Sequence, residues 1–319
     1  MSLGEFDLIA RYFTRPVRRA ALGIGDDCAL LAPGAGMQLA VSSDMLVEGR
    51  HFLSTVVPER LGHKALAVNL SDLAACGARP LGFTLALALP RADEVFLEGF
   101  ARGLFALADA HGIELVGGDT TQGPLNICIT AMGEVPVGGA LLRSGAQPGD
   151  DLYVSGTVGD ARLALEVFRG TQQLAGHDFE RVREAMERPQ PRVALGLALR
   201  GIASSAIDVS DGLLGDLGHI LRRSGVAAVV EVDAVPRSAV LGAQPLALQR
   251  TCTLAGGDDY ELLFTAPGPA ADRVHGAARE AGIAVTRIGR IEAGQDLRLV
   301  DGEGRQVTHT FGSFDHFKA

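Results

Sequence analysis

Residues 207–212, Ile-Asp-Val-Ser-Asp-Gly, bring two carboxylates and a hydroxyl close together in the chain. An apolar run precedes them and an amphipathic run, 213–221, follows them, which predicts a buried strand, a tight turn and the first turn of a helix. A helix N-terminus attracts phosphate, whereas carboxylates repel it unless a cation stands between them. The stretch predicts a cation-dependent phosphate site, or a simpler arrangement in which Ser210 or Asp211 only caps the helix.

Further aspartates occur at strand ends, beside glycine turns or on one helix face. They are Asp27, Asp44, Asp72 and Asp119, which join the pair Asp208 and Asp211. One such residue is usually a cap or a turn residue, but their repetition predicts a shared carboxylate cluster. Without cations this cluster would repel itself by kcal-scale energies in a partly buried site. Ligand sets made only of oxygen suit Mg²⁺, which keeps several waters and bridges to substrate phosphates.

Two glycine pairs, 117–118 and 256–257, would let backbone N–H groups approach phosphate oxygens. Together with the aspartates, they predict a magnesium-dependent nucleotide or phosphate enzyme. The nucleotide would be held by Mg²⁺, by backbone groups and by Arg143, unless Arg143 is only a solvated loop charge.

Several nucleotide-binding classes are excluded. A P-loop and a protein kinase each need a lysine at the phosphates, but Lys64 lies inside a predicted helix and Lys318 is penultimate. Residues 23–31 begin like a dinucleotide fingerprint, yet a third glycine is missing and two aspartates stand where phosphates would approach.

The elements that must position these groups can be read from hydrophobic periodicity. In the first half, strands are expected at 39–44, 82–89, 114–121 and 125–134, and helices at 60–76 and 93–111. Within the first of these helices, Asn69, Ser71 and Asp72 are poor helix formers. Asn69 and Asp72 share one helix face, so they either face solvent or point at a site.

The second half again mixes strands and helices. Strands are expected at 151–155, 226–232, 285–291 and 297–300, and helices at 159–168, 179–187, 192–200 and 269–281. A loop-rich stretch is expected between 232 and 256. Residues 136–150 are rich in Gly and Pro, which places a boundary between domains 1–136 and 137–319.

Composition limits the partners and the compartment. The formal net charge of −9 argues against nucleic acid or an anionic membrane surface as the main partner. The four cysteines form no Cys-x-x-Cys pair and suit a reducing cytoplasm. The longest apolar stretch, 83–89, is too short to span a bilayer. These features predict a cytoplasmic protein.

The motifs, in their order, resemble the thiamine-monophosphate kinase family, which belongs to a superfamily with aminoimidazole ribonucleotide synthetase and selenophosphate synthetase. The resemblance covers nearly the whole chain. The matching stretches are 4–9, 23–29, 44–52, 69–77, 117–121, 143–145, 207–213 and 257–262. The resemblance implies an aminoimidazole ribonucleotide synthetase-like fold with an α/β N-terminal domain and an α+β C-terminal domain. It also implies a homodimer joined through the N-terminal sheet, with the site in a cleft.

By position, the resemblance implies residue roles. Mg²⁺ ions would be bound by Asp27, Ser42, Ser43, Asp44, Asp72, Asp119, Asp208 and Asp211, the aspartates being the catalytic set. ATP would contact Gly118, Asp119, Arg143 and Ser210. Thiamine monophosphate would be held by His51, Glu261 and Phe314. Three residues depart from the common family pattern without removing the chemistry: Ser43 replaces Thr, Asp258 replaces Glu, and Phe314 replaces a frequent Tyr.

Two of the acceptor residues have simpler interpretations. His51 could be a loop histidine without a role, and Glu261 a polar residue on a half-exposed strand. The reaction implied is ATP-dependent phosphorylation of thiamine monophosphate to thiamine diphosphate by direct in-line transfer. The alternatives are a relative with a different acceptor, or a non-catalytic protein that binds thiamine phosphate or metal.

Overall fold

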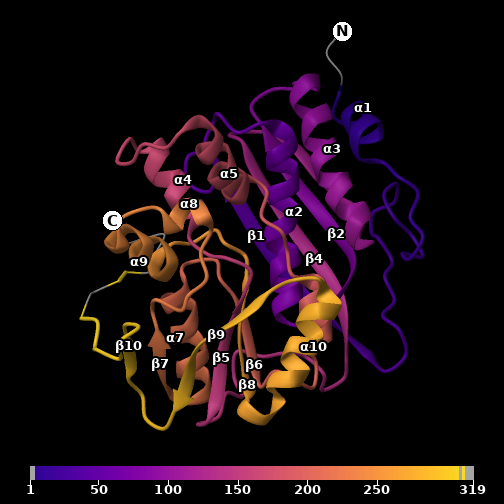
Figure 1. The fold of residues 1–319 in the computed structure, drawn as a ribbon. Helices are drawn as coiled ribbons and strands as arrows, with labels where there is room; N and C mark the ends of the chain where they lie inside the picture. The colour runs from indigo at the N-terminus through magenta and orange to yellow at the C-terminus, as the bar shows by residue number, and fades with distance from the viewer. Residues whose placement is uncertain (1–3, 309–310, 313–319) are drawn as a thin grey trace. The chain divides into compact units, whose positions relative to one another are not determined.

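The computed structural model describes residues 4–308, 311 and 312 of the 319-residue chain. Contacts within the chain divide it into two compact units, which are described separately below. Unit 1 comprises residues 1–73 and 78–138, and unit 2 comprises residues 74–77 and 139–319. Figure 1 shows the order of the helices and strands along the chain. No helix in the described part of the chain is long and apolar enough to cross a membrane.

Unit 1 is built on a four-stranded sheet with the order β1-β4-β2-β3. Its strands are β1 (Met37–Val47), β2 (Arg79–Leu89), β3 (Glu114–Gln122) and β4 (Asn126–Pro136). Strand β4 pairs antiparallel with β1 and with β2, whereas β2 and β3 are parallel. A parallel pair needs a long crossover, and helix α3 (Glu94–His111) supplies it.

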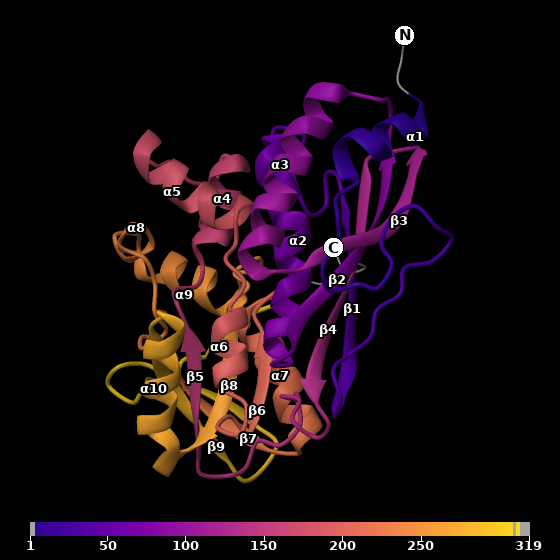
Figure 2. The same cartoon turned by 90° about the vertical axis from the view of Figure 1, so that its right-hand side faces the viewer.

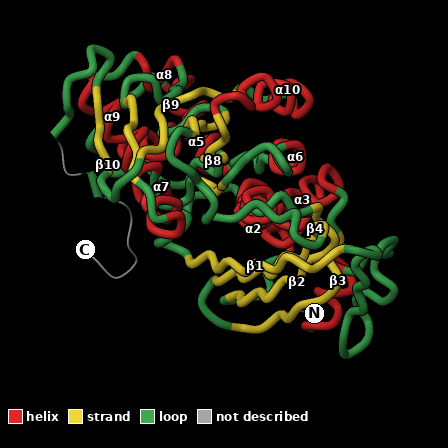
Figure 3. The backbone as a smooth tube through the Cα atoms, turned by 90° about the horizontal axis from the view of Figure 1, so that it is seen from below, coloured by secondary structure: helices red, strands yellow, loops and turns green. Residues whose placement is uncertain are grey.

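Helices α2 (Pro58–Ala75) and α3 cover one face of this sheet, as Figures 2 and 3 show. Their backbones meet at two glycines. A Cβ on Gly103 would lie 1.8 Å from the carbonyl oxygen of Glu59, and one on Gly62 would lie 2.0 Å from that of Phe100. Only glycine permits such an approach. The N-terminal segment adds helix α1 (Glu5–Leu8) and a π-helical turn, η1 (Ile9–Phe13).

The two faces of the sheet differ in what they carry. Leu46 of β1 is buried on the helix-covered face, while Val41 and Met45, which alternate with it, are 61% and 54% exposed. Alternation along a strand sends successive side chains to opposite faces. The face without helices therefore carries exposed apolar side chains along β1, and it is called the open face below.

Unit 2 contains a six-stranded sheet with the order β10-β7-β9-β5-β8-β6. The strands are β5 (Asp150–Ser155), β6 (Ser205–Asp208), β7 (Ala227–Glu231), β8 (Leu262–Pro267), β9 (Val285–Glu292) and β10 (Leu297–Val300). All neighbours are antiparallel except β10 and β7. A single apolar cluster joins the sheet to helix α7 (Leu213–Ser224) and includes Leu152, Ile207, Leu217 and Leu263.

The remaining helices of unit 2 are α4 (Asp160–Phe168), α5 (Gly176–Glu187), α6 (Val193–Ala198), α8 (Ala239–Gly242), α9 (Leu246–Ala255) and α10 (Ala271–Ala281), with a 3₁₀ turn η2 (Gly268–Ala270) before α10. The expectation of a loop-rich stretch between 232 and 256 was wrong over α8 and α9. Both helices bury apolar residues of their own, including Leu241, Cys252 and Leu254.

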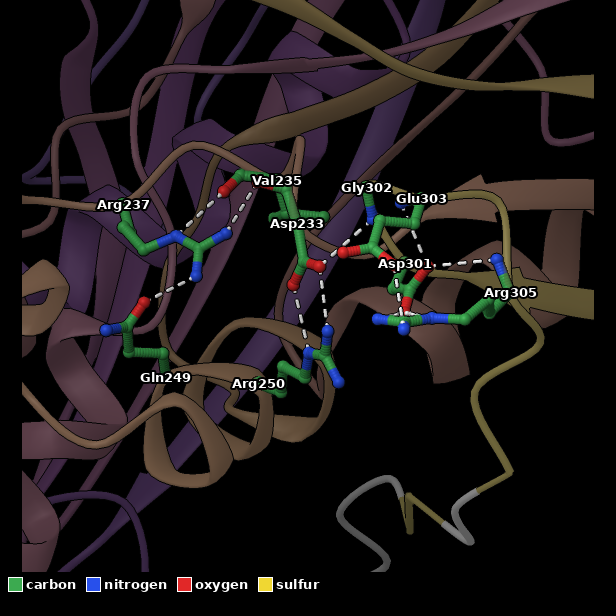
Figure 4. Close-up of polar contacts among 9 residues, drawn as sticks. All are labelled: Asp233, Val235, Arg237, Gln249, Arg250, Asp301, Gly302, Glu303 and Arg305. Carbon is green, nitrogen blue, oxygen red and sulfur yellow. Dashed lines mark hydrogen bonds and ion pairs between the residues drawn. The ribbon is translucent and has the colours of Figure 1, made fainter.

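An ionic network fixes the end of unit 2, as Figure 4 shows. Arg250 of α9 donates two hydrogen bonds to Asp233, at 2.9 and 2.7 Å, and Asp233 also accepts the N–H of Gly302. Asp301 accepts the N–H and the guanidinium of Arg305, which closes the turn after β10. The network ties α9 and the loop after β7 to the segment that precedes the C-terminal tail.

Candidate functional site

On the helix-covered face of unit 1, strand β1 and helix α2 bring oxygen donors together. The hydroxyl of Ser42 hydrogen-bonds to the carboxylate of Asp72. The side-chain oxygen of Asn69 accepts the backbone N–H of Asp44 at 3.2 Å. Asn69 and Asp72 thus both contact β1, which explains why helix α2 carries poor helix formers in its interior.

The open face of the same sheet carries a second group. Met45 pairs with Cys128, Cys128 with Ala86, and Ala86 with Asp119. Paired residues of neighbouring strands point to the same face of a sheet. Asp119 therefore lies on the face opposite to Asp44, and it is exposed. Ser43 also faces this side, because its hydroxyl lies 3.0 Å from that of Thr130.

Gly118 stands directly before Asp119 on β3. Its φ of +150° belongs to a region that favours glycine, and a Cβ there would lie 1.9 Å from the carbonyl oxygen of Leu85. A side chain at this position would push β3 away from β2. The glycine is thus required by strand pairing, in addition to any role toward a ligand.

Asp27 lies in the long segment between η1 and β1, and it is exposed. Its backbone N–H donates to the carboxylate of Asp26 at 2.9 Å. No described contact joins Asp27 to Asp44, Asp72 or Asp119.

The loop that carries His51 is anchored from helix α2. The Nδ1 atom of His51 accepts the N–H of Val47 at 3.0 Å, and the ammonium of Lys64 donates to the carbonyl oxygen of His51 at 3.2 Å. Lys64 is only 2% exposed. Burying an ammonium is costly unless it is hydrogen-bonded, so this contact fixes both Lys64 and the loop.

In unit 2, the loop after β6 lies beside the segment that leads into β8. The N–H of Val209 donates to the backbone carbonyl oxygen of Glu261 at 2.8 Å. The N–H groups of Tyr260 and Asp258 donate to the carbonyl oxygens of Val209 and Ser210, at 2.8 and 2.9 Å respectively. Asp258 and Tyr260 have φ values of 67° and 52°. Left-handed backbone at two non-glycine residues is strained, and such strain is concentrated at functional sites.

The strand–turn–helix prediction for residues 207–212 is confirmed, since β6 ends at Asp208 and α7 begins at Leu213. The capping interpretation is not what the structure shows, because Gly212 is the N-cap and no side chain caps the helix there. The carboxylate of Asp216, in the first turn of α7, instead accepts the N–H groups of Ser210, Asp211 and Gly212. Burial raises the pKa of Asp216 to about 7, against the lowering effect of these hydrogen bonds.

Glu261 is 3% exposed and already bonded inside unit 2. Its carboxylate forms an ion pair with Arg192, which donates one hydrogen bond of 2.7 Å, and it also accepts the hydroxyl of Ser155. An Arg partner neutralises the carboxylate locally. The interpretation as a half-exposed strand residue is therefore wrong, and any contact with a cationic ligand involves the Glu261–Arg192 pair as a unit.

Arg143 is exposed, and its loop is fastened to the last turn of α7. The hydroxyl of Ser224 accepts the N–H groups of Gly145 and Ala146 at 3.1 and 3.2 Å. Burial, then the charges of Arg222 and Arg143, lower the pKa of His219 on α7, whereas Asp211 raises it. The charges of Arg143 and Asp211 thus both act on His219.

Asp259, in the segment that leads into β8, is a half-buried acid. One carboxylate oxygen accepts the N–H of Gly159 at 2.8 Å, and the other has no hydrogen-bond partner. Burial raises the pKa of Asp259 well above its usual range, and the charges of Glu261, Asp160 and Asp258 act in the same direction.

Among the described residues, no three His, Cys, Asp or Glu side chains gather into a metal-binding group. The donors nevertheless have the chemistry that Mg²⁺ requires, because one or two carboxylates with water and substrate oxygens suffice for this ion. Asp72 with Ser42, and Asp208 with Asp211, offer such sets within their own units. Phe314 lies outside the described residues.

Sequence reasoning missed Arg192, Asp216 and Lys64. Arg192 contacts Glu261, which lies far away in the sequence, so no local pattern indicates this pair. Asp216 had one signal, since an acid in the first helical turn stands near free N–H groups.

The comparisons with known proteins define the class first. Residues 25–135 match the family described as AIR synthase related protein, N-terminal domain, and residues 147–302 match the corresponding C-terminal domain. These two matches confirm the expected two-domain fold.

Individual relatives narrow the class. The thiamine-monophosphate kinase of Salmonella typhimurium is 47% identical over 323 residues, which cover 99% of each chain. The crystal structure of thiamine-monophosphate kinase from Stenotrophomonas maltophilia K279a has a TM-score of 0.84 at 50% identity, covering 91% of this chain and 92% of that one. AaThiL complexed with AMPPCP and TMP has a TM-score of 0.76 at 29% identity, covering 90% and 89%. The chain belongs to the thiamine-monophosphate kinase family.

Proposed function

We propose that this chain transfers the terminal phosphoryl group of ATP to thiamine monophosphate, which yields thiamine diphosphate and ADP. The observation that carries the proposal is the 47% identity to a thiamine-monophosphate kinase along essentially the whole of both chains. The AaThiL structure, complexed with AMPPCP and TMP, supports a nucleotide and this acceptor as the two ligands.

The acceptor chemistry explains why the chain needs no general base. The second pKa of a phosphate monoester is about 6, so the acceptor is mostly a dianion at neutral pH. The difficulty is to bring this dianion to another polyanion and to align the two for in-line transfer. The proposal is direct transfer without a phosphorylated enzyme.

The proposed metal ligands are the oxygen donors of both units. They are Asp27, Ser42, Ser43, Asp44, Asp72, Asp119, Asp208 and Asp211. When bound, Mg²⁺ would neutralise phosphate charge and orient the phosphoryl group. Within unit 1, the hydroxyl of Ser42 on β1 hydrogen-bonds to the carboxylate of Asp72 on α2, which supports these two as a donor pair.

The proposed nucleotide contacts are Gly118, Asp119, Arg143 and Ser210. The exposed guanidinium of Arg143 suits a phosphate, because its fork of N–H groups matches phosphate oxygens.

The proposed acceptor contacts are His51, Glu261 and Phe314. Lys64 holds the His51 loop from helix α2, and Arg192 holds Glu261. Phe314→Ala should raise the KM for thiamine monophosphate and leave the KM for ATP nearly unchanged. A reversed pattern in steady-state kinetics would place the acceptor pocket elsewhere.

We also propose that the chain is a cytoplasmic homodimer joined through the open face of unit 1. The exposed apolar side chains of Val41 and Met45 support this, since such a surface favours burial against a partner. The variant Val41→Asp/Met45→Asp should sediment as a monomer in analytical ultracentrifugation. The control Val95→Asp, at an 81% exposed position of α3, should remain a dimer. A double variant that stays dimeric refutes this interface.

We retain domains 1–136 and 137–319 as the proposed folding units. The division of the contacts near residue 138 supports this boundary.

The deciding experiment offers ATP, Mg²⁺ and thiamine monophosphate to the full chain and follows thiamine diphosphate by chromatography. Product formation supports the proposal. ATP consumption only with another phosphorylated acceptor would favour a relative with different specificity. Tight binding of thiamine monophosphate by calorimetry without any ATP consumption would favour the non-catalytic alternative.

A further inference from the structure

Asp216 makes an unusual set of contacts at the start of helix α7. A single carboxylate oxygen, Oδ2, accepts the N–H groups of Ser210 at 3.0 Å, Asp211 at 3.1 Å and Gly212 at 3.2 Å. The side chain is 3% exposed. Three successive N–H groups of the loop therefore converge on one buried anion.

Such a convergence of backbone N–H groups normally forms an anion site. Loops that precede a helix bind phosphate in this way, because their N–H groups and the helix dipole both favour negative charge. Here the chain supplies its own carboxylate to that position. The three N–H groups are consequently not free to bind a phosphate of a substrate.

The same contacts fix the direction of the neighbouring side chains. Ser210 and Asp211 lie in irregular backbone between β6 and α7, where no strand or helix ladder orients them. The second restraint on the loop comes from Asp258, whose N–H donates to the carbonyl oxygen of Ser210 at 2.9 Å. Asp216 and the 258–261 segment therefore hold this loop together.

We propose that Asp216 is a positioning residue which fills the anion site of the 210–212 loop and so leaves phosphate binding there to cations on Asp208 and Asp211. This inference rests on the proposed function. It assigns the loop N–H groups to internal structure.

The test compares Asp216→Ala and Asp216→Asn with Asp160→Asn in the full chain. Asp160 is a suitable control because it is a half-buried acid in the first turn of α4, and its carboxylate accepts the hydroxyl of Ser238 at 2.6 Å instead of loop N–H groups. Asp216→Asn keeps an acceptor oxygen without the charge. If Asp216→Ala does not fold, Asp216→Asn carries the test.

Binding of Mn²⁺, followed by electron paramagnetic resonance of the free ion, measures the site without relying on activity. Asp216→Ala should weaken binding roughly 10- to 100-fold, as expected when a residue that orients metal ligands is removed. Asp216→Asn should lie between Asp216→Ala and the wild type, and Asp160→Asn should match the wild type. Equal Mn²⁺ binding by all four folded proteins would overturn the proposal.

Inorganic sulfate tests the filled anion site directly. Removing the Asp216 carboxylate leaves three N–H donors of the loop without their acceptor. Sulfate should therefore raise the thermal midpoint of Asp216→Ala more than that of Asp160→Asn at equal ionic strength. An identical sulfate response in both proteins would contradict the filling of an anion site.

Steady-state kinetics separate this inference from the proposed function. Asp216→Ala should lower kcat and raise the KM for ATP, with the KM for thiamine monophosphate unchanged. If the four proteins bind Mn²⁺ in the predicted rank order while the wild type forms no thiamine diphosphate, this result would refute the kinase proposal and support the role of Asp216.

Discussion

The oxygen donors Ser42, Asp44 and Asp72 of unit 1 are carried by regular elements, whereas Ser210 and Asp211 of unit 2 are carried by a loop. Ser42 and Asp44 belong to strand β1, and Asp72 belongs to helix α2, so backbone ladders fix the direction of each side chain. Ser210 and Asp211 depend instead on Asp216 and on the segment that begins at Asp258. The first arrangement is rigid and confines each donor to one face, while the second depends on a few distant contacts.

The largest effect is expected from Asp72→Asn. The change removes a carboxylate that helix α2 holds against Ser42 of strand β1. The kcat for thiamine diphosphate formation should fall at least about a hundredfold, with little change in thermal midpoint. Glu59→Gln on the same helix is the control, since Glu59 pairs with Arg102 on the surface. A kcat within a few-fold of the control would remove Asp72 from the ligand set.

Asp211→Asn tests the loop arrangement. It should also lose turnover, but the loss should be partly recovered at high Mg²⁺ because a loop adapts more readily than a strand. The measurement is kcat over a titration of Mg²⁺, beside Asp272→Asn, an exposed acid in the first turn of α10. Unchanged activity at limiting Mg²⁺ would show that Asp211 binds no essential ion.

Lys64→Met tests whether helix α2 also positions the loop that carries His51. The variant loses the hydrogen bond to the carbonyl oxygen of His51 but keeps a side chain of similar length. One hydrogen bond is worth about 1 kcal/mol, so the KM for thiamine monophosphate should rise roughly fivefold. The KM for ATP should stay constant. An equal rise in both constants would indicate general damage to unit 1.

The smallest effect is expected on the free energy of unfolding, from Asp233, which is not among the oxygen donors. The guanidinium of Arg250 and the N–H of Gly302 hold the pKa of Asp233 below its usual value. An acid with a lowered pKa in the folded state stabilises the fold above its unfolded pKa, about 3.9, and this stabilisation is lost as the pH falls through the folded value.

Chemical denaturation of Asp233→Asn and the wild type should therefore show the largest difference in unfolding free energy above about pH 5. The difference should shrink below about pH 4 and diminish with added salt. A difference that grows on acidification would reverse the sign of this linkage.

Local pattern was sufficient to predict the elements around most donors. Periodicity and helix-terminal signals placed β6, α7 and α2 within a few residues of their observed bounds, because those signals are contained in neighbouring residues. The helices α8 and α9 were missed, and α8 spans only four residues.

The direction of the donors was less accessible from sequence. The expected strand 114–121 closely matches β3, but the sequence did not show that the side chain of Asp119 points to the open face. That result depends on register across three pairs of strands. The Arg192–Glu261 pair joins residues far apart in the sequence, so no spacing rule could reveal it.

The burial of Lys64 gives the chain a built-in reporter. Lys64 and Lys318 are its only lysines, and Lys64 is enclosed in unit 1. An amine-directed label should reach it only when helix α2 separates from the His51 loop. The labelling rate of Lys64, measured by mass spectrometry, would therefore report how often the His51 loop opens locally.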